Sequence, residues 1–212
     1  MREGRPYRSR GVRALRLRAV LASGLVLGVG AAVTLASWTD REFATGSFQT
    51  SVFNTQSSVN GSAYADNSVS PGATVTIAGP FAPGVSSYFP VLIQTTANSV
   101  AGTAVLNGAV LGGTDAATLG AALVYRVVRT TATCNAAAFT GTPAFVVGAA
   151  ATTRALTAGQ ETGVTNALAA ATSTAPGAAT GFCFEVTLPA GAPNTLQGKT
   201  TTATWQFVTT SN

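Results

Sequence analysis

The sequence predicts an all-β fold, a two-sheet antiparallel sandwich that follows an N-terminal signal helix. The first observation is composition: the region after Ala36 is rich in Thr, Val, Ala, Gly and Ser, and branched Thr and Val side chains pack well on a pleated surface. The second is that several segments alternate apolar and polar residues with a period of two, as half-buried strands do. The third is that Gly and Pro turn signals separate these segments, and short strands joined by frequent turns are typical of sandwiches.

The first 36 residues have the three parts of a secretory signal peptide. Residues 1–18 are rich in arginine, residues 19–36 carry no charge, and small residues at Thr34 and Ala36 favour cleavage between Ala36 and Ser37. We therefore expect a signal peptidase to remove residues 1–36 and residues 37–212 to form one domain, secreted or held at the cell surface. An uncleaved anchor is the alternative, because an apolar run of this length can just span a bilayer. The membrane is expected to contact the protein only through this signal segment.

The positive charge of the chain is concentrated in the leader. The net charge is +5, yet the bases after Ala36 are nearly balanced by acids. Those bases are Arg41, Arg126, Arg129, Arg154 and Lys199, against Asp40, Glu42, Asp66, Asp115, Glu161 and Glu185. A neutral domain has no basic surface to pair with phosphates, so we expect no nucleic-acid partner.

Two strands and a short helix are expected in the first half of the domain. Residues 73–79 and 87–96 both alternate with a period of two. Pro90 cannot donate a ladder hydrogen bond, which predicts that the second strand lies at a sheet edge or is bulged there. Residues 114–123 are expected to form a helix of about two turns with Thr114 or Asp115 as its N-cap.

Three further strands are expected in the second half. Residues 122–131 are apolar at first and polar later; in 180–189, Phe182 and Phe184 share one face while Cys183 and Glu185 share the other. In 200–210, Trp205 lies on an apolar face, which favours a core residue over a sugar-binding platform. The low-complexity tract 149–180 is expected to hold one or two weak strands.

The chain contains two cysteines, Cys134 and Cys183. An even pair in an exported domain predicts one disulfide. Two free buried thiols are the alternative.

The residues that usually carry catalysis are absent or scattered. The chain has no histidine, which excludes Ser-His-Asp and Cys-His catalysis and His-ligated metals. Asp40 and Glu42 are interpreted as solvated charges and not as a glycosidase pair. We therefore expect no enzyme, no cofactor and no metal site, with calcium at Asp66 or Asp115 left open.

The stretch after the leader carries a more specific pattern. Trp38-Thr39-Asp40 followed by Ala44-Thr45-Gly46-Ser47-Phe48 resembles exported proteins with a SipW-type signal peptide, the group that includes the biofilm matrix protein TasA and camelysin. Residues 82–106 and 182–207 are similar to the Ala-rich, high-GC members of that group. The resemblance implies a jelly-roll-like sandwich, a dedicated signal peptidase, and a role in a biofilm matrix or surface fibre. The metalloprotease activity described for camelysin is not carried over, because this chain has no histidine to bind a metal.

The expected function is that of an exported structural protein that self-associates into fibres. Its assembly segment is expected at residues 37–53, which can add as a strand to a neighbouring sheet. Its named residues are Trp38, Asp40, Phe43, Gly46 and Phe48. Two alternatives stay open: residues 47–53 form the first strand of their own sandwich behind a disordered tail, or the domain is an extracellular module that binds carbohydrate or protein through loops.

Overall fold

The structure, a computed structural model, describes residues 14–24, 42, 45, 50–73 and 81–212. The chain divides into two units, Met1–Phe48 and Gln49–Asn212. In the first unit, residues 14–24 form an α-helix, and no helix of the described ranges has the length and apolarity that a membrane span needs. The predicted cleavage site, the expected strand at 73–79 except for its first residue, and most of the assembly segment lie outside the described residues; this includes Ala36, Ser37, Trp38, Asp40, Phe43, Gly46 and Phe48.

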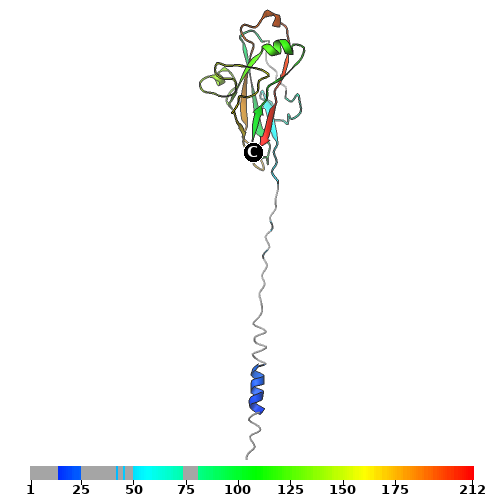
Figure 1. Ribbon diagram of the computed structural model, residues 1–212, viewed down its shortest axis with the longest axis vertical. Coiled ribbons are helices and arrows are strands. Elements are labelled where there is room, and N and C mark those ends of the chain that lie inside the picture. Colours follow the sequence, from blue (N-terminus) through cyan, green and yellow to red (C-terminus); the bar gives the residue numbers. More distant parts are fainter. Residues whose placement is uncertain (1–13, 25–41, 43–44, 46–49, 74–80) are drawn as a thin grey trace, which may run out of the picture. The chain divides into compact units, whose positions relative to one another are not determined.

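The second unit is an antiparallel all-β sandwich, as the sequence predicts (Figure 1). The large sheet has the order β1-β2-β9-β5-β6, with β7 also paired to β5, and the opposite layer consists of β11-β3-β8 and β10-β4. The strands are β1 (Thr55–Val59), β2 (Ser86–Thr95), β3 (Gly102–Leu106), β4 (Val110–Gly112), β5 (Val124–Arg129), β6 (Ala144–Val147), β7 (Arg154–Ala155), β8 (Asn166–Leu168), β9 (Thr180–Thr187), β10 (Thr202–Thr204) and β11 (Phe207–Ser211). Three short helical turns interrupt them: η1 (Ala116–Gly120), η2 (Ala136–Phe139) and η3 (Asn194–Leu196).

The core lies between the two layers and is rich in aromatic rings. Phe89 of β2 and Phe184 of β9 stack with their ring centroids 4.8 Å apart, and they belong to one cluster with Leu106 of β3 and Leu168 of β8. Trp205 packs against this cluster, with its ring 5.3 Å from that of Phe184. The prediction that Trp205 is a core residue is therefore confirmed.

The faces of β9 are those that the alternation predicts. Phe182, Phe184 and Val186 enter the core, and Cys183 and Glu185 point to the opposite face of the sheet. The second face is nevertheless buried, since Cys183 is 1% and Glu185 is 6% exposed. This outer burial was not predicted, and it marks the region where the candidate site lies.

The strand that contains Pro90 is neither at a sheet edge nor bulged at Pro90, since its register with β9 is continuous there, so that prediction is wrong. β2 lies between β1 and β9. However, β1 pairs only as far as Val59, opposite Val91, and the chain then turns at Asn60 and Gly61 with φ of 52° and 81°. The Pro90 carbonyl still accepts the Asn60 N–H at 2.9 Å. N–H and C=O of one strand residue point to the same side, so the missing N–H of Pro90 faces the end of β1, where only one ladder bond is lost.

The short helix appears near its expected place with Asp115 at its N-cap position, as predicted, but the side chain forms no capping hydrogen bond. η1 begins at Ala116. The carboxylate instead accepts the Lys199 ammonium at 2.8 Å and the Thr200 N–H at 3.0 Å. The bond from Lys199 is the main cause that lowers the pKa of Asp115. A tertiary ion pair has taken the oxygens that a local cap would use.

The expected C-terminal strand is divided into β10 and β11 at Trp205 and Gln206. The strands that pair with them, β4 and β3, are separated in the same way. Ala109, between β3 and β4, donates its N–H to the Leu156 carbonyl at 2.8 Å and so does not take part in the ladder. A Cβ atom at Gly108 would overlap the carbonyl of Thr157. The low-complexity tract supplies β7 and β8, as predicted.

Candidate functional site

A buried polar cluster lies on the outer face of the large sheet, on three adjacent strands. Tyr88 of β2 and Arg126 of β5 both stand opposite Glu185 of β9 in the strand register. The Tyr88 hydroxyl donates to Glu185 Oε1 at 3.0 Å, and Arg126 donates through Nε and Nη2 to Oε2, each at 2.5 Å. The side chains of Arg126 and Glu185 are 15% and 8% exposed. Each oxygen of the carboxylate is therefore engaged, and the pair is largely removed from water.

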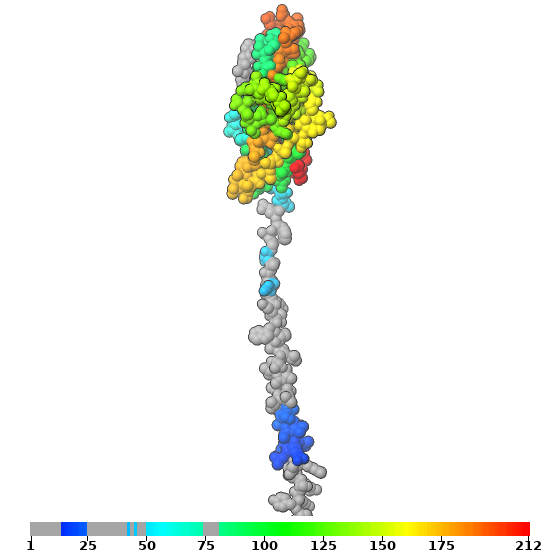
Figure 2. All heavy atoms as spheres, turned by 90° about the vertical axis from the view of Figure 1, so that its left-hand side faces the viewer, coloured from blue at the N-terminus to red at the C-terminus, as the bar shows by residue number. Residues whose placement is uncertain are grey.

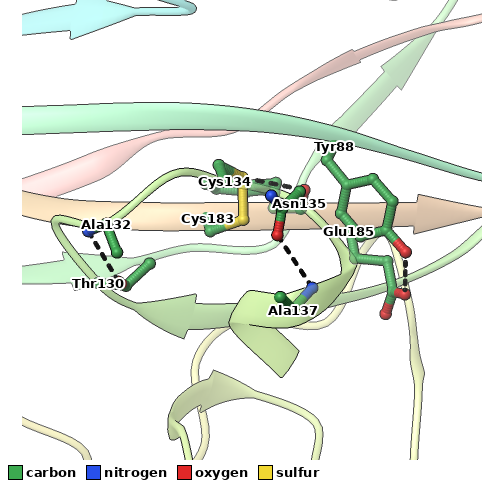
Figure 3. The surroundings of a disulfide bond; sticks show 9 residues. Tyr88, Thr130, Ala132, Cys134, Asn135, Ala137, Cys183 and Glu185 are labelled. Carbon is green, nitrogen blue, oxygen red and sulfur yellow. Dashed lines mark hydrogen bonds between the residues drawn. A yellow bond between two sulfur atoms is a disulfide. The ribbon is translucent and has the colours of Figure 1, made fainter. Parts of the chain in front are cut away.

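The disulfide and its loop cover this cluster. Cys134 and Cys183 are joined with their Cα atoms 5.2 Å apart, which confirms the predicted pairing (Figure 3). In the loop that follows, the Asn135 side chain accepts the Ala137 N–H at 2.9 Å and thus caps η2. η2 ends at Phe139, whose ring centroid lies 5.1 Å from the Arg126 guanidinium carbon. Figure 2 shows this lime-green part of the chain lying over the face turned to the viewer.

The chemistry of the cluster fits a structural role. Besides Glu185, Arg126 binds the Ala150 carbonyl through Nη1 at 2.5 Å. Both oxygens of the Glu185 carboxylate accept hydrogen bonds from neighbouring side chains, and the residue is only 6% exposed beneath a loop closed by a disulfide, so the cluster offers little access to a reacting group. The alternation of β9 predicts that Glu185 lies on the outer face, but it does not predict the roles of Arg126 and Tyr88, because these depend on strand order.

A second polar feature is an open pocket of about 530 Å³ where β5 ends and β9 begins. The Arg129 guanidinium lies in its wall and donates through Nη1 to the Thr165 carbonyl at 2.6 Å. Thr180 donates its hydroxyl to the Ala167 carbonyl at 2.7 Å. The lining residues are Arg129, Thr130, Thr131, Thr165, Ala167, Ala179, Thr180 and Gly181.

A third feature is the absence of charge in the strands of the second layer. β3, β4, β8, β10 and β11 contain no Asp, Glu, Lys or Arg. Val105 of β3 and Val208 of β11 stand opposite one another and are both 43% exposed. β5, β7 and β9 of the large sheet, in contrast, carry Arg126, Arg129, Arg154 and Glu185.

β11 is at the border of its sheet, and its pairing shows which backbone groups turn outward. The Asn107 N–H donates to Gln206 and the Asn212 N–H donates to Ala101, so alternate residues of β11 face β3. The N–H and C=O groups of Phe207, Thr209 and Ser211 consequently point away from β3. Within the described ranges, no backbone hydrogen bond reaches these outward groups.

The two residues considered for calcium, Asp66 and Asp115, bind different partners. Asp66 accepts the Ser68 N–H at 2.9 Å, whereas Asp115 is bound to Lys199. In the part of the chain that the structure describes, no group of three His, Cys, Asp or Glu residues lies close enough to hold a metal ion.

Comparison of the chain with protein-family models, with curated proteins and with solved structures finds no match. What can be inferred about function therefore rests on the three features described above. These are the buried Glu185 cluster, the open pocket beside Arg129, and the uncharged second layer with β11 at its border.

Proposed function

We propose that the protein is an exported structural protein, secreted or displayed at the cell surface, that self-associates into fibres of a biofilm matrix or cell surface. The observation that carries this proposal is the uncharged second layer, with β11 at its border. Thr-rich strands without charge suit edge-to-edge association. The resemblance of residues 38–48 to proteins with a SipW-type signal peptide supports the same function.

The edge of β11 lacks the devices that usually prevent association. Natural edge strands are protected by charged residues, by proline or by bulges, and residues 207–211 contain neither a charge nor a proline. The border at β1, in contrast, is partly covered: Ser57 exchanges two backbone hydrogen bonds with Ala65, at 2.9 and 3.0 Å. An added strand on β11 would gain backbone hydrogen bonds without opposing charge.

The donor of that strand is the N-terminal segment that begins at Ser37. Its last residues are held by their own domain, because the Val52 carbonyl accepts the Val100 N–H at 3.0 Å and Phe53 packs against the core. The exchangeable part is thus residues 37–49. Addition to a neighbouring molecule would be head-to-tail and would give open filaments, and attachment to the leader would prevent it until cleavage.

Export predicts a mature N-terminus at Ser37. Mass analysis of the protein recovered from the medium should find this terminus, and Ala36→Phe should block processing because the peptidase accepts only small side chains there. Ala32→Phe, outside the −3 and −1 positions, should be processed normally. Recovery of the protein from membranes with residues 1–18 attached would show an anchor instead.

Assembly predicts that a charge on the β11 border prevents filaments. Val208→Lys should abolish filaments in negative-stain microscopy and leave monomers in sedimentation, since the lysine side chain is exposed and the Val208 backbone keeps its bonds to β3. The matched control is Val85→Lys, because Val85 is 48% exposed and lies in a turn; it should assemble as the parent does. A protein that begins at Gly46 should also remain monomeric. Equal assembly of all four proteins, or none in the parent at high concentration, would contradict the proposal.

An extracellular binding module is the second candidate function. The observation that favours it is the open Arg129 pocket, which is lined by one arginine and otherwise by threonine, alanine and glycine.

A further inference from the structure

We propose that the Arg129 pocket binds a carboxylate group of an acidic polysaccharide, with the guanidinium on the carboxylate and the threonine hydroxyls on the sugar. This inference goes beyond the proposed structural function and does not depend on assembly. It rests on the unmatched charge of Arg129, the fixed position of its side chain and the composition of the pocket wall.

Arg129 is the one described base of the domain that forms no ion pair with a described carboxylate. Arg126, Arg154 and Lys199 each form an ion pair with a carboxylate, at 2.5, 2.8 and 2.8 Å. No described carboxylate lies within 4.0 Å of the Arg129 guanidinium. Since no described acidic side chain neutralises it, this cation is free to pair with an external anion.

The Arg129 side chain is held in position with most of its donors unused. Its one described hydrogen bond joins Nη1 to the Thr165 carbonyl at 2.6 Å. A guanidinium has five N–H donors in a planar fork that matches a carboxylate with two parallel bonds. Because the Thr165 bond already orients the fork, less conformational entropy is lost when an anion binds.

The wall behind the guanidinium is tightly built. Arg129 stands opposite Phe182 in the register of β5 and β9, and Thr130 donates its N–H to the Gly181 carbonyl at 2.9 Å. A Cβ atom at Gly181 would overlap the carbonyl of Thr130. The two strands therefore approach closely at the floor of the pocket, which provides a rigid surface for a ligand.

The lining favours a sugar chain. Four threonines and one arginine line the pocket, and the other lining residues are alanine and glycine. A hydroxyl both donates and accepts, so Thr130 and Thr180, which use one bond each within the domain, retain capacity for a ligand. The volume of about 530 Å³ lies within the usual range of ligand sites, about 300–1,000 Å³. No large apolar side chain is present to bury a peptide side chain, and the open form suits a polymer that crosses the surface.

The test is titration calorimetry of the exported protein with polygalacturonate. Binding is expected for polygalacturonate and not for its fully methyl-esterified form, which keeps the sugar and lacks the charge. Polyglutamate, which keeps the charge and lacks the sugar, should bind at least tenfold more weakly. Equal binding of the methyl ester would overturn carboxylate recognition, equal binding of polyglutamate would overturn the sugar, and no binding of polygalacturonate would overturn the site.

Variants assign the binding to the pocket. Arg129→Met should weaken it by about 10- to 100-fold, the usual effect of losing hydrogen bonds to a charged group. Arg154→Met removes a base elsewhere and should bind as the parent does. Ala179→Glu places a carboxylate in the lining and should also prevent binding, which keeps the test decisive if Arg129→Met does not fold. Measuring binding in the Val208→Lys background separates this result from the outcome for assembly; unchanged binding in the folded pocket variants would refute the site.

Discussion

Replacing Arg126 with methionine should lower the free energy of unfolding by about 3–5 kcal/mol, the usual cost of leaving a buried charge without its partner. The change removes both bonds to Glu185 and the contact with Phe139, while Glu185 stays 6% exposed. Methionine retains much of the apolar volume of the arginine stem. The decrease in the free energy of unfolding therefore measures the loss of the charge more than the creation of a cavity. Urea unfolding at neutral pH, followed by tryptophan fluorescence, measures it through Trp205 in the core.

The control for this prediction is the exposed pair Arg154–Glu161. Its side chains are 42% and 34% exposed and lie 2.8 Å apart. Because water and salt screen such a pair, Arg154→Met should cost less than about 1 kcal/mol. Equal losses in the two variants would mean that burial under the disulfide loop does not strengthen the dependence of Glu185 on Arg126.

The alternation of β9 shows how much of the fold the sequence can predict. A period of two assigns each residue to a face without knowledge of the partners, so the core positions Phe182 and Phe184 follow directly. The outer face is different: it is buried because the loop around Phe139 folds back over it. That contact joins segments far apart in the chain and has no local signal.

One local prediction failed and another held only in part, for the same physical reason. Pro90 was expected at a sheet edge, but β1 ends beside it, so a single missing donor is tolerated within an inner strand. Asp115 occupies the predicted N-cap position, but Lys199 and Thr200 bind the carboxylate oxygens that a capping bond would use. In each case a neighbour that is distant in the sequence changed the free energy of placing the residue there, which propensities based on the local sequence do not include.

The candidate sites were predicted unevenly. The cysteine pair could be predicted because only two cysteines are present in a chain whose leader predicts export. Arg126, Tyr88 and Arg129 could not, since ordinary charged and aromatic residues acquire a role only when the order β2-β9-β5 places them together. The order of strands depends on long-range pairing, which alternation along one segment does not encode.

Removing the disulfide should lower the free energy of unfolding by about 4 kcal/mol, the chain-entropy value for a loop of this length. Cys134 and Cys183 are 49 residues apart. The first measurement is mass spectrometry of the unreduced protein, which should contain a linked Cys134–Cys183 peptide; two thiols open to alkylation would contradict the bond. Urea unfolding with and without reductant then measures the loss, and Cys134→Ala/Cys183→Ala should show no response to reductant.

The disulfide and Arg126 should also be energetically coupled. The bond anchors Cys134 beside β9, and the same loop carries Phe139 to the Arg126 guanidinium, 5.1 Å from its ring. Once the loop is released, water can reach Glu185, and the loss caused by Arg126→Met should fall toward the value of an exposed pair, below about 1 kcal/mol. A double-mutant cycle that combines Arg126→Met with Cys134→Ala/Cys183→Ala measures this coupling. Strictly additive losses would show that the loop covers the ion pair without the help of the disulfide.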